Sequence, residues 1–497
     1  SGLLAWVGLA PWFYWIGRQS TVAEDFFRSL ILGISFQATL NYWLLAMHPL
    51  TWLGISYATS LVVVVVAWAG VASFIGSGIA LGGTVYGILV RRFLRAGGPC
   101  WLLPLLAATF WFTFEWAQTK GDLAYPWGAL ALSQVSYLPL LQLLPIGGPY
   151  LLAGILAGSN AALAEGWRGE RRPLLVAGGL VSITLLYGFW ALRPTPTGTV
   201  PVALIQGNAR SEEKWDPHLI EQIATRYLEL SAQATAARLV VWPESAIPIL
   251  WNDPANTGSQ ALVNRIHEAF DRSDRYLLTG AFFYRPRPHA KDVDLFNATT
   301  LIGNQQPGWQ WEAKRHLVPF GEFMPFRSFL PDILAKLNVL THDLSRGAGP
   351  NPFTLPGGLI VGTGVCFDSI FPLALVADTA ASASLLAVVT NDAWYKDTAA
   401  PHQHFAHAIL RAVENRRFLL RAANTGISGI VDPYGRVLTR SRTFTPAVVT
   451  GKIAPQHELT LFTRWGNWLL WPSLAILTGA ALWAFKKKGS SSKCQDV

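Results

Sequence analysis

Long apolar runs separated by short polar loops occupy the first part of the chain, and one further run lies near its end. Most runs approach the ~20 residues that an α-helix needs to cross a bilayer, whereas the first is short and the third is too long for one straight helix. We predict one crossing for each run, with the third tilted or broken among its glycines between positions 76 and 87. The seven predicted transmembrane segments cover residues 2–16, 27–47, 55–90, 101–117, 138–156, 174–192 and 468–485.

After residue 195 the pattern changes to short β-branched or apolar runs that alternate with helix-like periodicity. This alternation predicts an α/β domain of about 260 residues. Strands are expected at residues 200–206, 238–242, 276–282, 296–302, 359–366, 385–390 and 419–424, and helices at 218–232, 260–270 and 402–416. The predicted domains are N-terminal transmembrane helices at 1–195, the α/β domain at 196–460, a C-terminal transmembrane helix at 461–489 and a polar cytoplasmic tail at 490–497.

Composition and charge agree with a membrane protein. Hydrophobic residues make up 51% of the chain and charged residues 14%, against ~25% charged residues in soluble domains. Basic clusters at 91–95, 168–172 and 486–488 adjoin apolar runs, which is the positive-inside pattern and disfavours nucleic acid as a partner. Their alternation places the α/β domain on the non-cytoplasmic side. It also places Ser1 there, so we expect a preceding membrane segment or signal to be missing, or the chain to have been trimmed.

Three segments of the α/β domain combine an apolar strand with reactive side chains at its end. Glu244 follows one strand, Lys314 precedes Glu322 in a second segment, and Cys366 ends a glycine-rich strand. Taken alone, each residue has a more ordinary interpretation, as a solvated carboxylate, a surface lysine or a small core residue. Together, at strand ends where α/β folds place their sites, they supply a base, a cation and a nucleophile for acyl transfer through a thioester.

The motifs around these residues resemble the nitrilase superfamily, and more narrowly its membrane branch, the apolipoprotein N-acyltransferase family. The resemblance implies an αββα sandwich for the α/β domain and a Glu–Lys–Cys triad in this chain order. The matching motifs are W-P-E at 242–244, K-x-x-L-V-P-F-G-E at 314–322, G-V-C-F-D at 364–368, N-D-A-W at 391–394 and N-T-G-I-S at 424–428, with F-E-W at 114–116 in the membrane part.

The resemblance also implies a role for each residue. Cys366 is expected to be the nucleophile, Glu244 the general base, and Lys314 the cation that stabilises the oxyanion and lowers the thiol pKa. The backbone N–H of Phe367 would complete the oxyanion site, and Glu322 would orient Lys314 or form a plain loop salt bridge. Four further residues are pocket candidates, with core packing as the favoured role for the first two: Trp215, Asn297, Trp394 and Tyr395.

The implied reaction moves an acyl chain from a phospholipid, through a Cys366 thioester, to the N-terminal amine of a diacylglyceryl-cysteine lipoprotein. The implied location is the bacterial inner membrane with the catalytic domain on the periplasmic side, and no cofactor or metal is expected. A membrane-tethered amidase and a non-catalytic lipoprotein-binding protein remain alternatives. Phe367, Asp368 and Lys396 depart from the family pattern, which affects lipid or acceptor preference, and the sequence does not indicate the oligomeric state.

Overall fold

The computed structural model describes residues 2–18, 20–51, 54–271, 275–287, 293–303, 309–326 and 343–486. The chain divides into two compact units. The first comprises the chain up to residue 120, residues 124–193 and the chain from 465 onward, and the second comprises residues 121–123 and 194–464. The predicted tail at 490–497, and Lys487 and Lys488 of the last basic cluster, lie outside the described residues.

The first unit is helical. Among the described residues, four helical stretches are long and apolar enough to cross a membrane by length and composition: Tyr57–Arg95, Cys100–Ala117, Leu144–Trp167 and Arg171–Ala191. The last predicted segment contains a shorter apolar helix, Leu470–Phe485. The first predicted segment contains only a 3-10 turn and a short helix, and the second contains a helix that begins with Glu24 and Asp25 in its first turn. The helices of this unit are α1 (Ala10–Trp15), α2 (Val22–Leu40), α3 (Tyr57–Arg95), α4 (Leu103–Ala117), α5 (Leu138–Leu141), α6 (Leu144–Trp167), α7 (Arg171–Ala191) and α15 (Leu470–Lys486).

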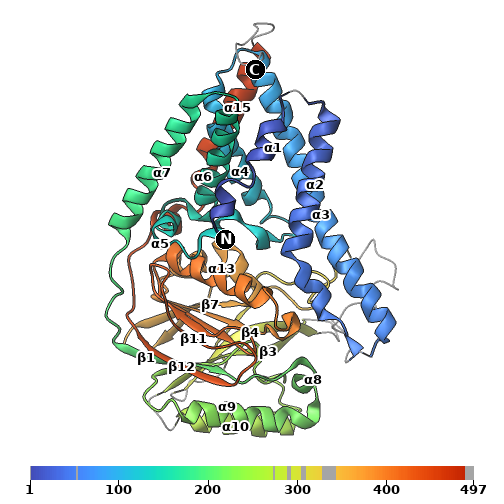
Figure 1. Ribbon diagram of the computed structural model, residues 1–497. Coiled ribbons are helices and arrows are strands. Elements are labelled where there is room, and N and C mark those ends of the chain that lie inside the picture. The colour runs from blue at the N-terminus through green and yellow to red at the C-terminus, as the bar shows by residue number, and fades with distance from the viewer. Residues whose placement is uncertain are drawn as a thin grey trace. The chain divides into compact units, whose positions relative to one another are not determined.

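Of the two alternatives for the third segment, a tilted helix or a broken one, the break is absent, because α3 runs unbroken through all of its glycines. Three of these glycines, Gly76, Gly83 and Gly87, lie against α2 and let the two helices pack closely (Figure 1). A Cβ atom at Gly76 would lie 2.8 Å from the backbone nitrogen of Ile34, and one at Gly83 would lie 2.2 Å from Ser29 Oγ. Small residues at such a helix–helix contact serve close approach of the backbones rather than bending.

The second unit is an α/β domain with two six-stranded sheets. Their strand orders are β12-β1-β2-β3-β4-β5 and β11-β10-β9-β8-β7-β6. In each sheet three adjacent strands are parallel, β1 to β3 in one and β7 to β9 in the other. The strands are β1 (Val200–Gln206), β2 (Leu239–Val241), β3 (Tyr276–Pro286), β4 (Val293–Ile302), β5 (Trp311–Ala313), β6 (Phe353–Leu355), β7 (Leu359–Val365), β8 (Leu385–Thr390), β9 (Leu419–Ala423), β10 (Gly429–Val431), β11 (Val437–Arg440) and β12 (Ala447–Ile453).

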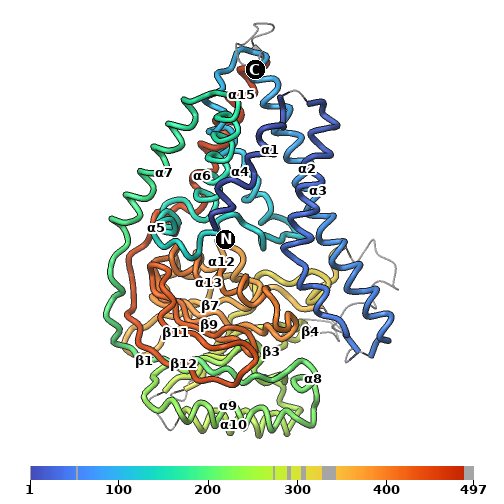
Figure 2. Tube along the Cα trace, viewed as in Figure 1, coloured from blue at the N-terminus to red at the C-terminus, as the bar shows by residue number. Residues whose placement is uncertain are grey.

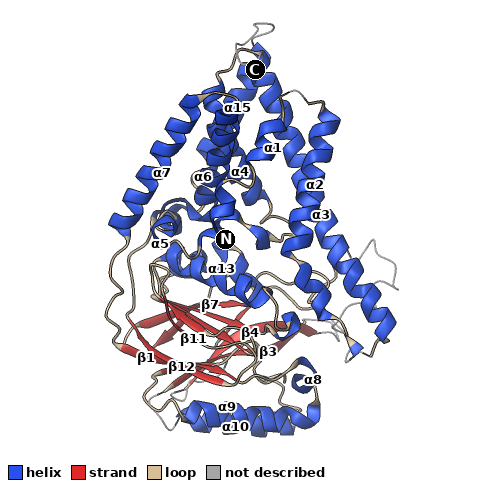
Figure 3. Cartoon of the chain, in the orientation of Figure 1, coloured by secondary structure: helices blue, strands red, loops and turns tan. Residues whose placement is uncertain are grey.

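Helices cover the outer faces of the two sheets, which gives an αββα sandwich (Figure 3). The helices α9 (Ile220–Ala232) and α10 (Thr257–Asp271) pack on the first sheet, and α12 (Pro372–Ala380) and α13 (Ala400–Asn415) pack on the second. The described part of this unit also contains two short helices, α8 (Ser211–Lys214) and α14 (Leu461–Trp465).

Burial on both faces explains why the central strands are continuous apolar runs. Every residue of β8 is buried. Between the sheets, Leu204 and Val241 share one hydrophobic core with Val361 and Leu420. Strand β1 pairs antiparallel with β12, which the chain reaches more than two hundred residues later (Figure 2). This long-range pairing places β12 at the edge of the first sheet, beside β1.

Candidate active site

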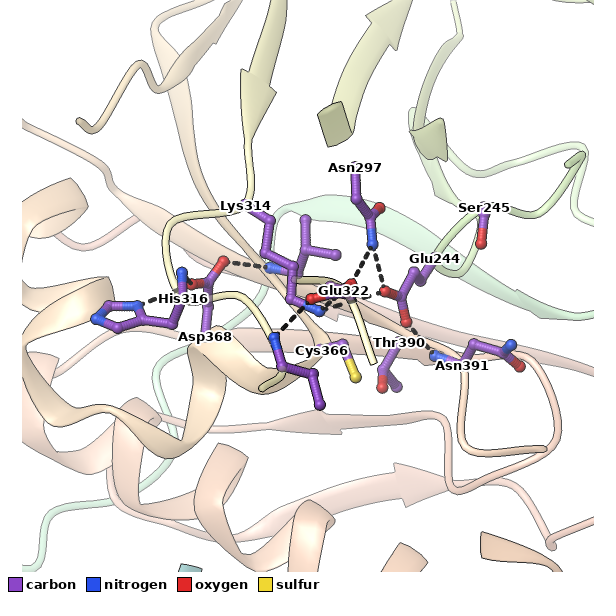
Figure 4. Close-up of polar contacts among 12 residues, drawn as sticks. Glu244, Ser245, Asn297, Lys314, His316, Glu322, Cys366, Asp368, Thr390 and Asn391 are labelled. Atoms are coloured by element: carbon purple, nitrogen blue, oxygen red, sulfur yellow. Dashed lines mark hydrogen bonds and ion pairs between the residues drawn. The ribbon is translucent and has the colours of Figure 1, made fainter. Parts of the chain in front are cut away.

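The sandwich brings the three predicted triad residues together from both sheets (Figure 4). Glu244 follows β2 and Lys314 follows β5 of the first sheet, whereas Cys366 begins the 3-10 turn η9 (Cys366–Ile370) after β7 of the second. All three side chains are buried, with relative exposures of 7%, 1% and 8%. The backbone N–H of Lys314 donates to the carbonyl of Asn297 at 2.8 Å, which ties the lysine to β4.

Two carboxylates share the Lys314 ammonium. Lys314 Nζ lies 2.8 Å from Glu322 Oε1 and 3.7 Å from Glu244 Oε1. Burial alone would lower the pKa of Lys314, but the charges of Glu322 and Glu244 outweigh it and raise that pKa. The lysine is therefore a fixed cation at any physiological pH. Glu322, predicted either to orient Lys314 or to form a loop salt bridge, contacts Lys314 and also accepts from the backbone N–H of Val318 at 2.8 Å.

Asn297 connects the same two carboxylates. Its Nδ2 donates to Glu244 Oε1 at 2.7 Å and to Glu322 Oε1 at 3.1 Å. Core packing, the role favoured from the sequence, therefore does not describe this residue. The second oxygen of Glu244 accepts from the backbone N–H of Asn391 at 2.9 Å, so the base is held at both oxygens.

We expect Asn297→Leu to lower the rate of the acylation half-reaction by about 10- to 100-fold, since a hydrogen bond to a charged group contributes ~1.5–3 kcal/mol. Leucine preserves the volume of the side chain but removes the amide that bridges Glu244 and Glu322. The rate of formation of the acylated protein, measured in a single turnover, checks the expectation. A rate equal to that of the wild type would mean that Asn297 only fills space.

The backbone of Glu244 passes unusually close to β3. A Cβ atom at Gly280 would lie 2.5 Å from Glu244 Cα and 2.6 Å from the backbone nitrogen of Ser245. Gly280→Ala should therefore displace Glu244 and reduce the acylation rate by at least ~10-fold, because small misplacements of reacting groups cost up to 10²-fold. Gly349→Ala is the matched control, since a Cβ atom there has no neighbour within 4 Å. Equal rates in both variants would contradict the prediction.

The Cys366 thiol is protonated in the resting site. Burial and the charge of Glu244 raise the thiol pKa, and they outweigh Lys314 and a side-chain hydrogen bond with Thr390, which lower it. Lys314 lowers the thiol pKa, as expected, but by less than burial and Glu244 raise it. The thiol thus needs a base to ionise, and Glu244 is the neighbouring carboxylate. Cys366 has a φ of 49°, a left-handed conformation that costs energy in a residue with a Cβ atom and must be held by its surroundings.

A buried polar network holds the turn that begins at Cys366. Ser369 Oγ donates to the Cys366 carbonyl at 2.7 Å, and His404 Nε2 lies 3.0 Å from that hydroxyl. His404 Nδ1 lies 3.0 Å from Asp392, which also accepts from Arg421 at 2.9 Å. Although burial opposes ionisation, Arg421 and His404 hold the pKa of Asp392 well below its usual range. The network gives Asp392 of the N-D-A-W motif a role that the sequence alone did not indicate.

Asp368 occupies the turn after Cys366. It accepts from the backbone N–H groups of Val365 and His316, at 3.1 and 2.8 Å. Burial opposes its ionisation, yet the hydrogen bond with the His316 ring and the nearby charges lower its pKa. Asp368, one of the positions that depart from the expected motif, thus joins the turn that begins at Cys366 to the segment after Lys314.

The remaining pocket candidates are aromatic side chains in different settings. Trp215 is 38% exposed and lies against Phe282, with 6.2 Å between the ring centroids. The Tyr395 ring meets His404 edge-on at 6.1 Å, and Trp394 is half-buried beside it in the 3-10 turn Ala393–Tyr395. Phe367 is buried, and its ring lies edge-on to Phe371 at 5.3 Å.

Sequence reasoning missed Lys214, a buried lysine at the end of α8. Its Nζ donates to the carbonyl of Glu244 at 2.9 Å and to Ser245 Oγ at 3.0 Å. It also missed Thr390 and the backbone of Asn391, which touch Cys366 and Glu244. A lysine in a four-residue polar helix has the pattern of a surface residue, so only the fold shows that it is buried.

Two family models match the chain in adjacent regions. The carbon–nitrogen hydrolase model matches residues 201–458, and the model of the apolipoprotein N-acyltransferase N-terminal domain matches residues 1–162. The first match covers the α/β domain, which therefore has a nitrilase-like fold. A nitrilase-superfamily amidase from Nesterenkonia aligns over 57% of this chain and 100% of its own, with 19% identity and a TM-score of 0.39.

Bacterial relatives match nearly the whole chain. An apolipoprotein N-acyltransferase from Gloeobacter violaceus is 33% identical over 490 residues, which cover 96% of this chain and 88% of the relative. One from Geobacter metallireducens is 33% identical over 98% of this chain and 91% of the relative. The match thus extends through the helical unit as well as the α/β unit. The chain belongs to the apolipoprotein N-acyltransferase family.

Proposed function

We propose that this protein transfers an acyl chain from a phospholipid to the N-terminal amine of a diacylglyceryl-cysteine lipoprotein, through a thioester on Cys366. The observation that carries the proposal is the buried contact of Lys314 with two carboxylates, Glu244 and Glu322, beside a buried protonated thiol. This set supplies a nucleophile, a base and a permanent cation in a site with little water.

In the first half-reaction the Glu244 carboxylate accepts the Cys366 thiol proton, and the thiolate attacks the ester carbonyl carbon of the phospholipid. The negative charge that develops on the carbonyl oxygen is stabilised by the Lys314 ammonium and by the backbone N–H of Phe367. The tetrahedral intermediate then collapses. The C–O bond breaks, Glu244 returns its proton to the leaving alkoxide, and lysophospholipid departs from the acylated enzyme.

In the second half-reaction the free amine of the diacylglyceryl-cysteine attacks the thioester carbonyl. Glu244 accepts the proton that the amine loses as the C–N bond forms, and the C–S bond breaks to release the Cys366 thiolate. The proton passes from Glu244 back to sulfur, which restores the resting site. Asn297 and the Asn391 N–H hold the two oxygens of Glu244 in place and so fix the base through both proton transfers.

Both proposed substrates are lipids, so an enzyme that uses them needs access to a membrane, which the apolar helical unit would provide. We infer that residues 1–195 and 461–489 form the membrane domain, with about seven crossings, and that residues 196–460 form the catalytic domain. The basic clusters at 91–95 and 168–172 support a cytoplasmic position for those loops and hence a catalytic domain on the periplasmic side of the bacterial inner membrane.

The same three side chains would also serve an amidase that hydrolyses a carbon–nitrogen bond. The helical unit and the whole-length match to acyltransferases favour acyl transfer. A non-catalytic lipoprotein-binding protein would not need a base held at both oxygens beside a thiol.

The test is to incubate the purified full-length protein with a phospholipid labelled in its acyl chains and to run a gel without thiol reductant. We expect label on the protein that hydroxylamine releases, and transfer of that label to an added diacylglyceryl-cysteine peptide. Label recovered only as free fatty acid would indicate a hydrolase. A protein that acquires no label from any phospholipid would overturn the proposal.

A further inference from the structure

The site contains a second buried cation that the proposed mechanism does not use. Lys214 is 1% exposed, and its ammonium donates to the backbone carbonyl of Glu244 at 2.9 Å and to Ser245 Oγ at 3.0 Å. Ser245 has a φ of 39°, so Lys214 holds a strained backbone directly after the general base. Lys214 therefore fixes the main chain of Glu244, whereas Asn297 and Asn391 hold the Glu244 carboxylate.

Lys214 has only neutral hydrogen-bond acceptors in this position. Over the described part of the chain, no carboxylate lies within ion-pairing distance of its ammonium. On its own helix, Glu212 is exposed and Glu213 pairs with Arg226 at 3.9 Å. A buried charge without a direct counter-ion is costly. The charge of Lys214 can therefore act on nearby groups. The Glu244 carboxylate and the Cys366 sulfur are close enough to interact with it electrostatically.

Among Glu244, Glu322, Lys314 and Lys214, the charges balance only when Lys214 is counted. Asp392, which also acts on Cys366, is already paired with Arg421 at 2.9 Å. Glu244 and Glu322 contribute two negative charges, and Lys314 contributes one positive charge between them. Without a second cation the site would hold an excess negative charge before Cys366 loses its proton. That excess would oppose both the thiolate and the oxyanion of the tetrahedral intermediate.

We infer that Lys214 is a positioning residue for acyl transfer, which fixes Glu244 through its backbone and supplies the positive charge that favours ionisation of Cys366. The inference rests on the proposed function and deepens it. Lys214 touches neither the thiol nor, in the proposed mechanism, the substrate. It acts through Glu244 and through its charge.

Because the charge of Lys214 depends on its proton, the rate of Cys366 acylation should depend on pH. Burial lowers the pKa of Lys214 to about 8, and the negative charge of Glu244 limits the decrease. Below that pH the lysine is charged and favours the thiolate. As the pH rises through about 8 the charge is lost, so the acylation rate should fall. Lys314 stays charged over the same range because its carboxylate partners raise its pKa.

The experiment measures the single-turnover rate of Cys366 acylation between pH 6 and 10 (about four pH units, enough to follow one titration). The donor is labelled phosphatidylglycerol, whose head group does not titrate in that range. We expect Lys214→Met to reduce the rate at pH 7 by at least ~10-fold, the change that accompanies a shift of one pKa unit in the thiol. The decline near pH 8 should disappear in Lys214→Met. In Lys214→Arg it should move beyond the measured range, because a guanidinium stays charged.

Lys452→Met, at an exposed lysine of β12, is the matched control and should behave like the wild type. Thermal unfolding of each variant separates loss of fold from loss of rate. A wild-type profile without a decline near pH 8, or Lys214→Met that acylates as fast as the wild type, would overturn the inference. If the wild type acquires no label at all, the proposed function fails instead.

Discussion

Cys366→Ser should acquire no hydroxylamine-sensitive label from phospholipid, with an acylation rate at least ~10³-fold below that of the wild type. A serine hydroxyl is far less acidic than a thiol, and burial together with the charge of Glu244 already raises the pKa of Cys366. The thiol already resists giving its proton to Glu244, and an alcohol is less acidic still, so a carboxylate is too weak a base to ionise it. The oxygen would also be a poorer leaving group when the amine attacks.

The fold should survive this substitution. Serine nearly matches cysteine in volume, the residue lies in a buried turn, and the bond from Ser369 Oγ goes to the main-chain carbonyl, which the substitution retains. An unchanged thermal unfolding midpoint together with the absence of label would assign the chemistry to the sulfur atom. Persistent label on Cys366→Ser, released by hydroxylamine, would place the nucleophile elsewhere in the chain.

The central strands were predictable because their environment is uniform. Strands β1 and β8 lie where the apolar runs 200–206 and 385–390 predict them, since strands buried on both faces need apolar residues throughout. Of the strands in the described part of the chain, five were not predicted. Three of these, β5, β6 and β10, have three residues each, too few for any periodicity. The strand β12 alternates in burial and depends on β1 for its pairing, which lies far away in sequence.

Some residues of the candidate site could likewise be predicted from the sequence, and others could not. Glu244 and Cys366 could be selected from sequence because each ends a strand within a recognisable motif. The contacts of Asn297 and Lys214 could not, because they depend on how β4 and α8 meet the segment after β2. In the helical unit, the glycines of α3 allowed either a tilt or a break to be predicted, and the sequence did not show that Gly76, Gly83 and Gly87 instead permit close packing on α2.

Lys314→Met should also reduce acylation strongly, with a rate about 10²- to 10³-fold below that of the wild type, as for the loss of an oxyanion-hole donor. Its effect on stability should be large as well. Lys314 is 1% exposed and contacts two carboxylates, and removal of one partner from a buried ion pair costs about 3–5 kcal/mol. The thermal unfolding midpoint of this variant should therefore fall.

The stability of Lys314→Met should also depend on pH in a defined direction. Without the ammonium, Glu244 and Glu322 are left buried close together, which raises the pKa of at least one of them above its value in the unfolded chain. An acid with a raised pKa in the folded state stabilises the fold at low pH and loses that contribution as the pH rises through the raised value. The variant should therefore approach the stability of the wild type as the pH falls toward 5, a value near the carboxylate pKa of about 4 in the unfolded chain.

A second variant separates the loss of catalysis from the loss of stability. The double substitution Lys314→Met with Glu322→Gln removes one positive and one negative charge, so that Glu244 no longer faces a second carboxylate. Its unfolding midpoint should recover most of the loss seen in the single variant, whereas its acylation rate should stay at the level of Lys314→Met. Recovery of acylation in the double variant would show that the ammonium serves only to neutralise Glu322, and that Lys314 does not act on the reacting ester.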